Sequence, residues 1–433
     1  MNLVDLESSL QRPLCPICGV GHIRAIDKFR GKYLEFRCPT PGCKWIGYAP
    51  LPELNKKIIY LDTSNISHMA NALLRDETDS PWILLHDQLR RAVAAEVICC
   101  PSSSIIEDEA ELSPNSDQVE KIIRLSGVFG DIEFFPQNLI IEKQLFSALK
   151  RFLGEEPPIH YVPETRQEAF SKDPNHWLTV FNLRVKLSTP LEWLHSRQMT
   201  KTESREVLKR ACQSYLKQGK QFKEILDIEA SSFGQEIINL GIRPLKITLG
   251  LEPPDSFNRF DQNLFVKIFF YLLRELNLSY DDAFTKSVEF LLSDHVKIIP
   301  FANIQANLVA GIAMKSRGPK PRPIKSSDSY DINHISTYLP YVDTLVVDTF
   351  FADLCNQSNI RLGEKYGCEI RKLVPADIPL FIEDLDTLIR TSPHANLAAR
   401  IAEAIDEGGF HQEFNEKIRE QLENYRYTSD EEP

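Results

Sequence analysis

Several features that mark large functional classes are missing from this 433-residue sequence. No apolar run reaches the roughly 18 residues that a membrane-spanning helix needs, because the most apolar stretch is interrupted by Lys267, Arg274 and Glu275. The opening residues MNLVDLESSL lack a basic region followed by an apolar core, so we expect no secretory signal. These absences predict a cytoplasmic protein with no membrane partner.

Motifs of common enzyme classes are absent as well. The sequence has no GxSxG turn, GxxxxGK[ST] loop or GxGxxG turn, which excludes serine hydrolases, P-loop NTPases and dinucleotide enzymes of the usual kind. Its ten histidines show no HxH, HExxH or CxxH spacing, so we interpret each as a surface or core residue. With 50 basic and 61 acidic side chains the net charge is -11, so any contact with nucleic acid must be local.

Four of the nine cysteines stand in two pairs near the N-terminus. Cys15 and Cys18 form one pair, and Cys38 and Cys43 follow after a gap of 19 residues. Two such pairs on facing hairpins can bind one tetrahedral zinc ion through their thiolates. A segment with so few large apolar side chains could hardly fold without a metal. We therefore predict a structural Zn²⁺ site, and we interpret the other five cysteines as core residues.

The segment CPICG…RAIDKFRGKYLEFRCPTPGCKWIG resembles the small zinc ribbons appended to topoisomerases and other nucleic-acid enzymes. Residues 1–57 carry nine basic and five acidic side chains, whereas the remainder of the chain has a net charge of -15. Cations bind phosphates and aromatic rings stack on bases, so the ribbon suits single-stranded nucleic acid. The candidate binding residues are Arg30, Lys32 and Trp45. The alternative is a structural or protein-docking ribbon.

Strand and helix patterns alternate in the rest of the chain. Short buried runs predict strands at residues 57–61, 97–100, 344–347 and 369–373, with helical patterns between them. This order is typical of an α/β fold with a parallel sheet. Residues 140–300 are mostly helical, with helices expected at 144–152, 204–230 and 260–276. We interpret this helical middle as an insertion into the α/β domain.

Carboxylates follow the predicted strands. Asp62 and Asp348 each come directly after a strand, whereas Glu107, Glu109 and Asp331 each lie in the first turns of a helix. The carboxyl ends of parallel strands share one edge of the sheet, so these acids can converge. Convergent carboxylates repel unless divalent cations neutralise them, and hard oxygen ligands select Mg²⁺ or Mn²⁺. Taken singly, each acid is better explained as a helix cap.

Three motifs connect this pattern to a known family. The segments IIYLDTSNI, CCPSSSIIEDE and DINHISTYLPYVDTLVVD, the last followed by a helix and CEIRKL, resemble the PIN-domain nucleases. The resemblance is greatest to a large bacterial PIN-like group marked by a Leu-Pro-Tyr-x-Asp segment, and it spans residues 57–385. It implies a Rossmann-like parallel sheet and Mg²⁺- or Mn²⁺-dependent cleavage of RNA or single-stranded nucleic acid. Small PIN domains have no equivalent of the helical middle.

The resemblance assigns roles to individual acids. Asp62 corresponds to the metal-binding acid after the first strand, Asp331 to the acid that opens the penultimate helix, and Asp348 to the acid after the fourth strand. The second acid is Glu107 or Glu109, which cannot share a face because they stand two residues apart on a helix. Glu107 is slightly favoured.

Two further aspartates lie near these positions. Asp343 opens the strand that Asp348 closes, and five strand residues separate the two by roughly 16 Å, so they cannot bind the same ion. We therefore assign Asp343 a structural role. Asp328, three residues before Asp331, can support the cluster from behind.

A basic, proline-rich segment precedes Asp331. Between residues 315 and 325 it has five cations and no acid, and its prolines keep it extended, so it can hold a phosphate backbone at the mouth of the site. Its cations are Lys315, Arg317, Lys320, Arg322 and Lys325. A soluble linker is the alternative interpretation.

Together these patterns predict three regions: a zinc ribbon at 1–54, a PIN-like nuclease domain at 55–390 with a helical insertion at about 137–300, and a helical tail at 391–433. The predicted activity is hydrolysis of phosphodiester bonds by two metal ions, with substrate held by the ribbon and the basic segment. The alternative is a catalytically inactive PIN-fold scaffold in a larger defence or toxin-like assembly. The sequence leaves open a homo-oligomer or a regulatory protein partner.

Overall fold

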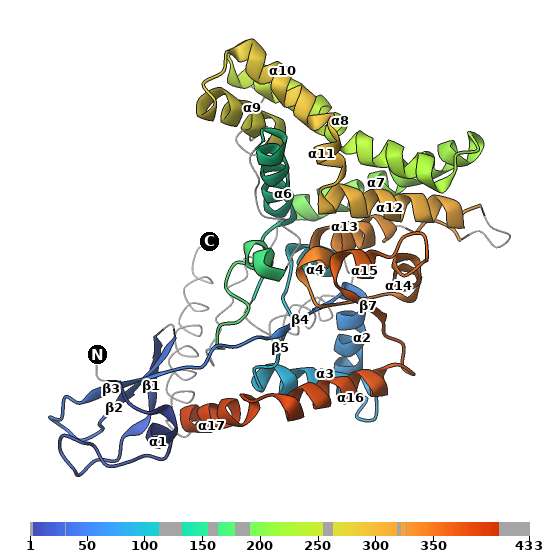
Figure 1. The fold of residues 1–433 in the computed structure, drawn as a ribbon. Coiled ribbons are helices and arrows are strands. Elements are labelled where there is room, and N and C mark those ends of the chain that lie inside the picture. Colours follow the sequence, from blue (N-terminus) through green and yellow to red (C-terminus); the bar gives the residue numbers. More distant parts are fainter. Residues whose placement is uncertain are drawn as a thin grey trace, which may run out of the picture.

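The computed structural model contains two separate sheets within the residues it describes (Figure 1). The described residues are 3–30, 32–111, 132–154, 163–177, 191–253, 263–317, 322–325 and 327–406. The first sheet is antiparallel, has the order β1-β2-β3 and belongs to the N-terminal segment. Its strands are β1 (Arg24–Arg30), β2 (Tyr33–Arg37) and β3 (Ile46–Pro50).

The second sheet has four strands, all parallel, in the order β5-β4-β6-β7. The strands are β4 (Lys57–Leu61), β5 (Ile98–Cys99), β6 (Thr344–Val347) and β7 (Glu369–Lys372). The central strands β4 and β6 are buried at almost every position, as expected for a sheet covered on both faces. The predicted α/β class with a parallel sheet is confirmed.

The order of the strands produces one topological switch point in this sheet. From β4 the chain continues to β5 on one side, whereas β6 pairs with the opposite side of β4. The winding direction therefore reverses between β4 and β6. Open α/β sheets bind ligands outside the carboxyl ends of the strands at such a reversal.

Helices cover both faces of the parallel sheet. In Figure 1, α3 and α16 run together beneath it, while α12 and α13 lie above it. These helices are α2 (Thr63–Leu74), α3 (Pro81–Ala94), α4 (Ser104–Glu111), α12 (Pro300–Lys315), α13 (Asp328–Tyr338), α14 (Thr349–Cys355), α15 (Leu362–Tyr366) and α16 (Ile378–Thr391), with the 3-10 turn η3 (Leu339–Tyr341) between α13 and β6.

The helical middle of the chain has an apolar core of its own, centred on Phe265, Phe269 and Phe290. It comprises α6 (Gln137–Phe152), the 3-10 helix η1 (Pro163–Ala169), α7 (Leu191–Lys217), α8 (Phe222–Thr248), α9 (Leu264–Glu275), α10 (Tyr280–Leu291) and α11 (Asp294–Lys297). The single helix predicted at residues 204–230 is wrong. Gly219, with φ +69°, ends α7, and Gln221 begins α8 with a capping box.

The N-terminal sheet is attached to the rest of the molecule by segments from far along the chain. Its apolar core includes Trp177 together with Ala398 and Ile401 of α17 (Ala395–Asp406), and α1 (Leu6–Leu10) packs against α17. Trp177 Nε1 donates to the carbonyl of Pro52 at 2.9 Å. Much of the predicted tail at 391–433 lies outside the described residues, which end at 406.

No helix in the described ranges combines the length and the apolar character needed to cross a membrane.

Candidate functional site

The four N-terminal cysteines come together in the structure. Their Sγ atoms all lie within 4.8 Å of one another, with 3.7 Å between Cys15 and Cys43 and 3.6 Å between Cys18 and Cys38. The chain can approach closely here because Gly21 has no Cβ, which would lie 3.0 Å from the Cys38 sulfur and 2.3 Å from a side-chain oxygen. This group could hold a metal such as zinc, as predicted.

The electrostatics of the thiols fit a bound cation. The backbone N–H groups of Gly21 and Val20 stabilise the Cys18 thiolate and lower its pKa to about 6. At Cys43 the amide of Trp45 also favours the thiolate, but burial and the crowded neighbouring thiols outweigh it and raise the pKa to about 12. A divalent cation at the centre removes this repulsion, because thiolate ligands bind it deprotonated.

The structure changes one part of the nucleic-acid face that was predicted on the ribbon. Trp45 is 7% exposed and belongs to the apolar core of the ribbon, so the prediction that its ring stacks on bases is corrected. That core joins ribbon residues with Trp177 and with α17, which lie far from Trp45 in sequence. Lys32 remains exposed, with Glu53 at 3.2 Å. The side chain of Arg30 lies outside the described part of the structure.

Asp62 and Asp348 occupy the carboxyl ends of β4 and β6, where the winding direction reverses. Each also caps the helix that follows: Asp62 Oδ1 accepts from the Asn65 N–H at 3.0 Å and from the Ser64 hydroxyl at 2.9 Å, and Asp348 Oδ1 accepts from the Phe351 N–H at 2.8 Å. Burial raises the pKa of Asp62 to about 6, although these hydrogen bonds favour the ionised form.

Asp331, in the first turn of α13, lies close to the other acids. Burial is the largest cause that raises its pKa to about 9, and the charges of Asp62, Glu109, Asp348 and Asp328 contribute to the same rise in that order. Of the two candidate glutamates, only Glu109 is among the five largest causes of this shift in the pKa of Asp331. Among the described residues, the four cysteines are the only group of three or more possible metal ligands whose ligand atoms all lie within 4.8 Å of one another, so the acids do not form such a tight group.

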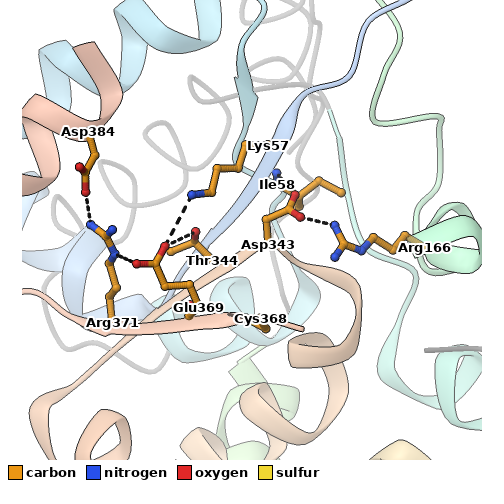
Figure 2. A network of polar contacts seen from close by, with 9 residues as sticks. All are labelled: Lys57, Ile58, Arg166, Asp343, Thr344, Cys368, Glu369, Arg371 and Asp384. Carbon is orange, nitrogen blue, oxygen red and sulfur yellow. Dashed lines mark hydrogen bonds and ion pairs between the residues drawn. The ribbon is translucent and has the colours of Figure 1, made fainter. Parts of the chain in front are cut away.

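Asp343 lies at the opposite edge of the sheet, where Figure 2 shows its surroundings. Its Oδ2 accepts from the backbone N–H of Ile58 at 2.8 Å, and its Oδ1 pairs with Arg166. Near it, Lys57 of β4 pairs with Glu369 of β7 at 3.6 Å, so an ion pair spans the intervening strand β6 at this edge. This is the structural position that the sequence predicted for Asp343.

The basic segment is anchored beside the acidic cluster. The Arg322 guanidinium forms two 2.7 Å bonds to the fully buried Asp328 carboxylate, which also accepts from the Lys325 N–H at 2.8 Å. The same guanidinium stacks 3.7 Å from the centre of the Phe350 ring. Arg322 therefore holds the segment in place. The sequence predicted Arg322 as a phosphate-binding residue and did not predict this ion pair. Lys320 lies outside the described residues.

The other predicted cations of this segment differ from Arg322. Lys315, Arg317 and Lys325 are exposed, and Lys325 is three residues from Asp328 at the start of α13. Their charges therefore face solvent.

Sequence reasoning missed one residue of this region, His334. It is 2% exposed on α13, three residues after Asp331, and its ring lies between Tyr60 and Glu109. The sequence has no paired histidine motif, so His334 was predicted to be an ordinary core or surface residue. The signal that could have identified it is the spacing of three from Asp331, which puts both side chains on one side of a helix.

No protein-family model matches the chain, and no curated protein or solved structure is significantly similar to it. Support for a function must therefore come from its own residues.

Proposed function

We propose that this protein is a PIN-like nuclease that hydrolyses phosphodiester bonds of RNA or single-stranded nucleic acid with Mg²⁺ or Mn²⁺. The observation that carries the proposal is the acidic cluster at the carboxyl edge of the sheet. Burial and neighbouring carboxylates hold a proton on Asp331 up to a pKa of about 9. A scaffold has no need to gather acids that repel one another, whereas divalent cations stabilise such a group.

The donor set fits a hard divalent cation, because it consists of carboxylate oxygens. Asp62, Glu109, Asp331 and Asp348 are the residues that would hold it. In both Asp62 and Asp348 the hydrogen bonds found among described residues go to Oδ1, so the capping interactions fix each side chain and leave Oδ2 for a ligand. Two bound cations would supply an activated water and a charge that stabilises the leaving oxygen.

The proposal gives substrate binding to cations away from the cluster. Lys315, Arg317 and Lys325 are exposed on the segment that leads to α13, and the salt bridge between Arg322 and Asp328 keeps that segment near the acids. Lys32 offers a further charge on the ribbon. The zinc ion would stabilise the ribbon fold and take no part in the reaction.

The test compares Asp62→Asn and Asp348→Asn with a control at the other end of β6, Asp343→Asn. Cleavage of single-stranded RNA and DNA is measured with Mg²⁺ or Mn²⁺. Asn caps a helix nearly as well as Asp but cannot neutralise a cation, so both cluster variants should stay folded and lose cleavage. The control should lose stability, because its ion pair with Arg166 is removed, and keep cleavage. Full activity in either cluster variant contradicts the proposal.

A further inference from the structure

A chain of buried polar side chains runs behind the acidic cluster and connects α4, β4 and α13. The Tyr60 hydroxyl lies 2.7 Å from the Ser103 hydroxyl and 2.7 Å from His334 Nδ1. The other ring nitrogen, His334 Nε2, faces Glu109 Oε2 at 3.5 Å. Tyr60 is fully buried, and Ser103 and His334 are each 2% exposed. This series of side chains thus starts at Ser103, just before α4, passes through Tyr60 of β4 and His334 of α13, and ends at Glu109 of α4.

The directions of these hydrogen bonds follow from what each group can donate. Ser103 Oγ accepts from the Ile106 N–H at 3.3 Å, and its own proton can then be given to Tyr60. In this order the Tyr60 O–H donates to His334 Nδ1, which lies 2.7 Å away. A neutral imidazole that accepts at Nδ1 carries its proton on Nε2. The reverse order would place a bare Nε2 lone pair opposite the Glu109 carboxylate, which is repulsive.

His334 Nε2 has no hydrogen-bond partner among the described residues. The 3.5 Å to Glu109 is longer than a hydrogen bond, and a buried donor left unsatisfied destabilises the fold. A shift of a few tenths of an ångström by the carboxylate would complete the bond. The structure therefore presents a buried N–H group directed at one acid of the cluster.

We propose that His334 is a positioning residue whose Nε2–H, fixed in that tautomer by Tyr60 and Ser103, orients the Glu109 carboxylate toward the cation site. The cation part of this inference rests on the proposed function. The arrangement also selects Glu109 over Glu107 as the second acid, because Glu109 is the carboxylate at 3.5 Å from the ring.

The first experiment measures Mn²⁺ affinity by electron paramagnetic resonance in wild type, His334→Leu, His334→Gln and Tyr60→Phe. Loss of a group that orients a metal ligand typically weakens metal binding about 10–100-fold, which we expect for His334→Leu. A Gln amide nitrogen can take the place of Nε2, so His334→Gln should recover most of the affinity. His86→Gln is the control, since His86 is also buried but pairs with Asp87 elsewhere, and its affinity should equal wild type.

The second experiment reads the tautomer directly, first in the wild-type protein. In ¹⁵N-histidine-labelled protein without Mn²⁺, the His334 ring should carry its proton on Nε2, and Tyr60→Phe should reduce this preference. A proton on Nδ1 overturns the inference.

The outcomes separate the two proposals. Equal Mn²⁺ affinity in wild type and His334→Leu overturns the positioning role and leaves the nuclease proposal standing. Weak binding in His334→Leu with recovery in His334→Gln supports the positioning role even if no cleavage is detected. A wild-type protein that binds no Mn²⁺ overturns both.

Discussion

Asp331 and Asp328 stand three residues apart on α13, and their substitution by Asn should have opposite effects on stability. Asp331 has like charges around it and a pKa raised to about 9 from the usual 3.8. Asp328 is fully buried but forms a two-pronged ion pair with Arg322. Asp331→Asn should therefore stabilise the Mg²⁺-free protein, while Asp328→Asn should destabilise it.

The magnitude for Asp331 follows from the difference between the folded and unfolded states. At pH 7 the unfolded chain ionises this group, whereas the folded chain must keep it protonated. Roughly three pH units at about 1.4 kcal/mol each give a cost of ~4 kcal/mol. Asp331 is partly exposed, and solvent screening reduces the figure to about 2 kcal/mol, which Asn recovers.

The sign of the pH dependence is fixed by the raised pKa. The folded protein binds more protons than the unfolded chain between the usual pKa of 3.8 and the folded pKa of about 9. Wild-type stability without divalent cations should therefore fall as pH rises through that window. Asp331→Asn removes this contribution, so its advantage over wild type should grow from pH 4 to pH 8.

Urea unfolding of zinc-loaded protein, in buffers free of Mg²⁺ and Mn²⁺ at pH 5, 7 and 8, measures the effect. Asp328→Asn leaves Arg322 without its partner and should cost about 3 kcal/mol at each pH. Adding Mn²⁺ should stabilise wild type and not Asp331→Asn. A loss of stability in Asp331→Asn at pH 7, or an advantage that does not change with pH, refutes the reasoning.

Two further predictions concern the metal and the basic segment. Removing zinc, or substituting Cys38→Ser, should unfold the ribbon and shift tryptophan fluorescence to longer wavelength as Trp45 and Trp177 become exposed. The control Cys355→Ser should keep full zinc content. An unshifted spectrum in zinc-free protein counts against a structural metal. Changing Lys315, Arg317 and Lys325 together to Gln should weaken binding of single-stranded substrate. The slope of log affinity against log salt should fall by up to ~2, because about 0.7 of a counterion is released for each phosphate contact. An unchanged slope shows that these side chains do not touch phosphates.

The parts of the fold that the sequence predicted well depend on local patterns. The strands β4 and β6 are short apolar runs that end at an aspartate, and this pattern alone placed Asp62 and Asp348 after buried strands. The cysteine pairs likewise met because each pair is a local turn on a small sheet. Such features are readable because neighbouring residues determine them.

The features that sequence reasoning missed arise from contacts between distant segments. Trp45 is an aromatic residue in a basic ribbon, and it is buried in an apolar core that also contains Trp177 and α17, more than 100 residues away. His334 gains its place from Tyr60, which is 274 residues away in sequence. The end of α7 at Gly219 was readable in principle, because glycine favours the left-handed backbone that terminates helices.

Anomalous diffraction from crystals soaked in Mn²⁺ tests the central claim most directly, because it locates bound cations without reference to activity. We predict Mn²⁺ among Asp62, Glu109, Asp331 and Asp348, at the carboxyl ends of β4 and β6, with hard oxygen ligands. Asp62→Asn crystals treated in the same way should show a weaker peak or none. Wild-type crystals with no Mn²⁺ at this edge of the sheet, while the four-cysteine site holds its metal, would contradict the account.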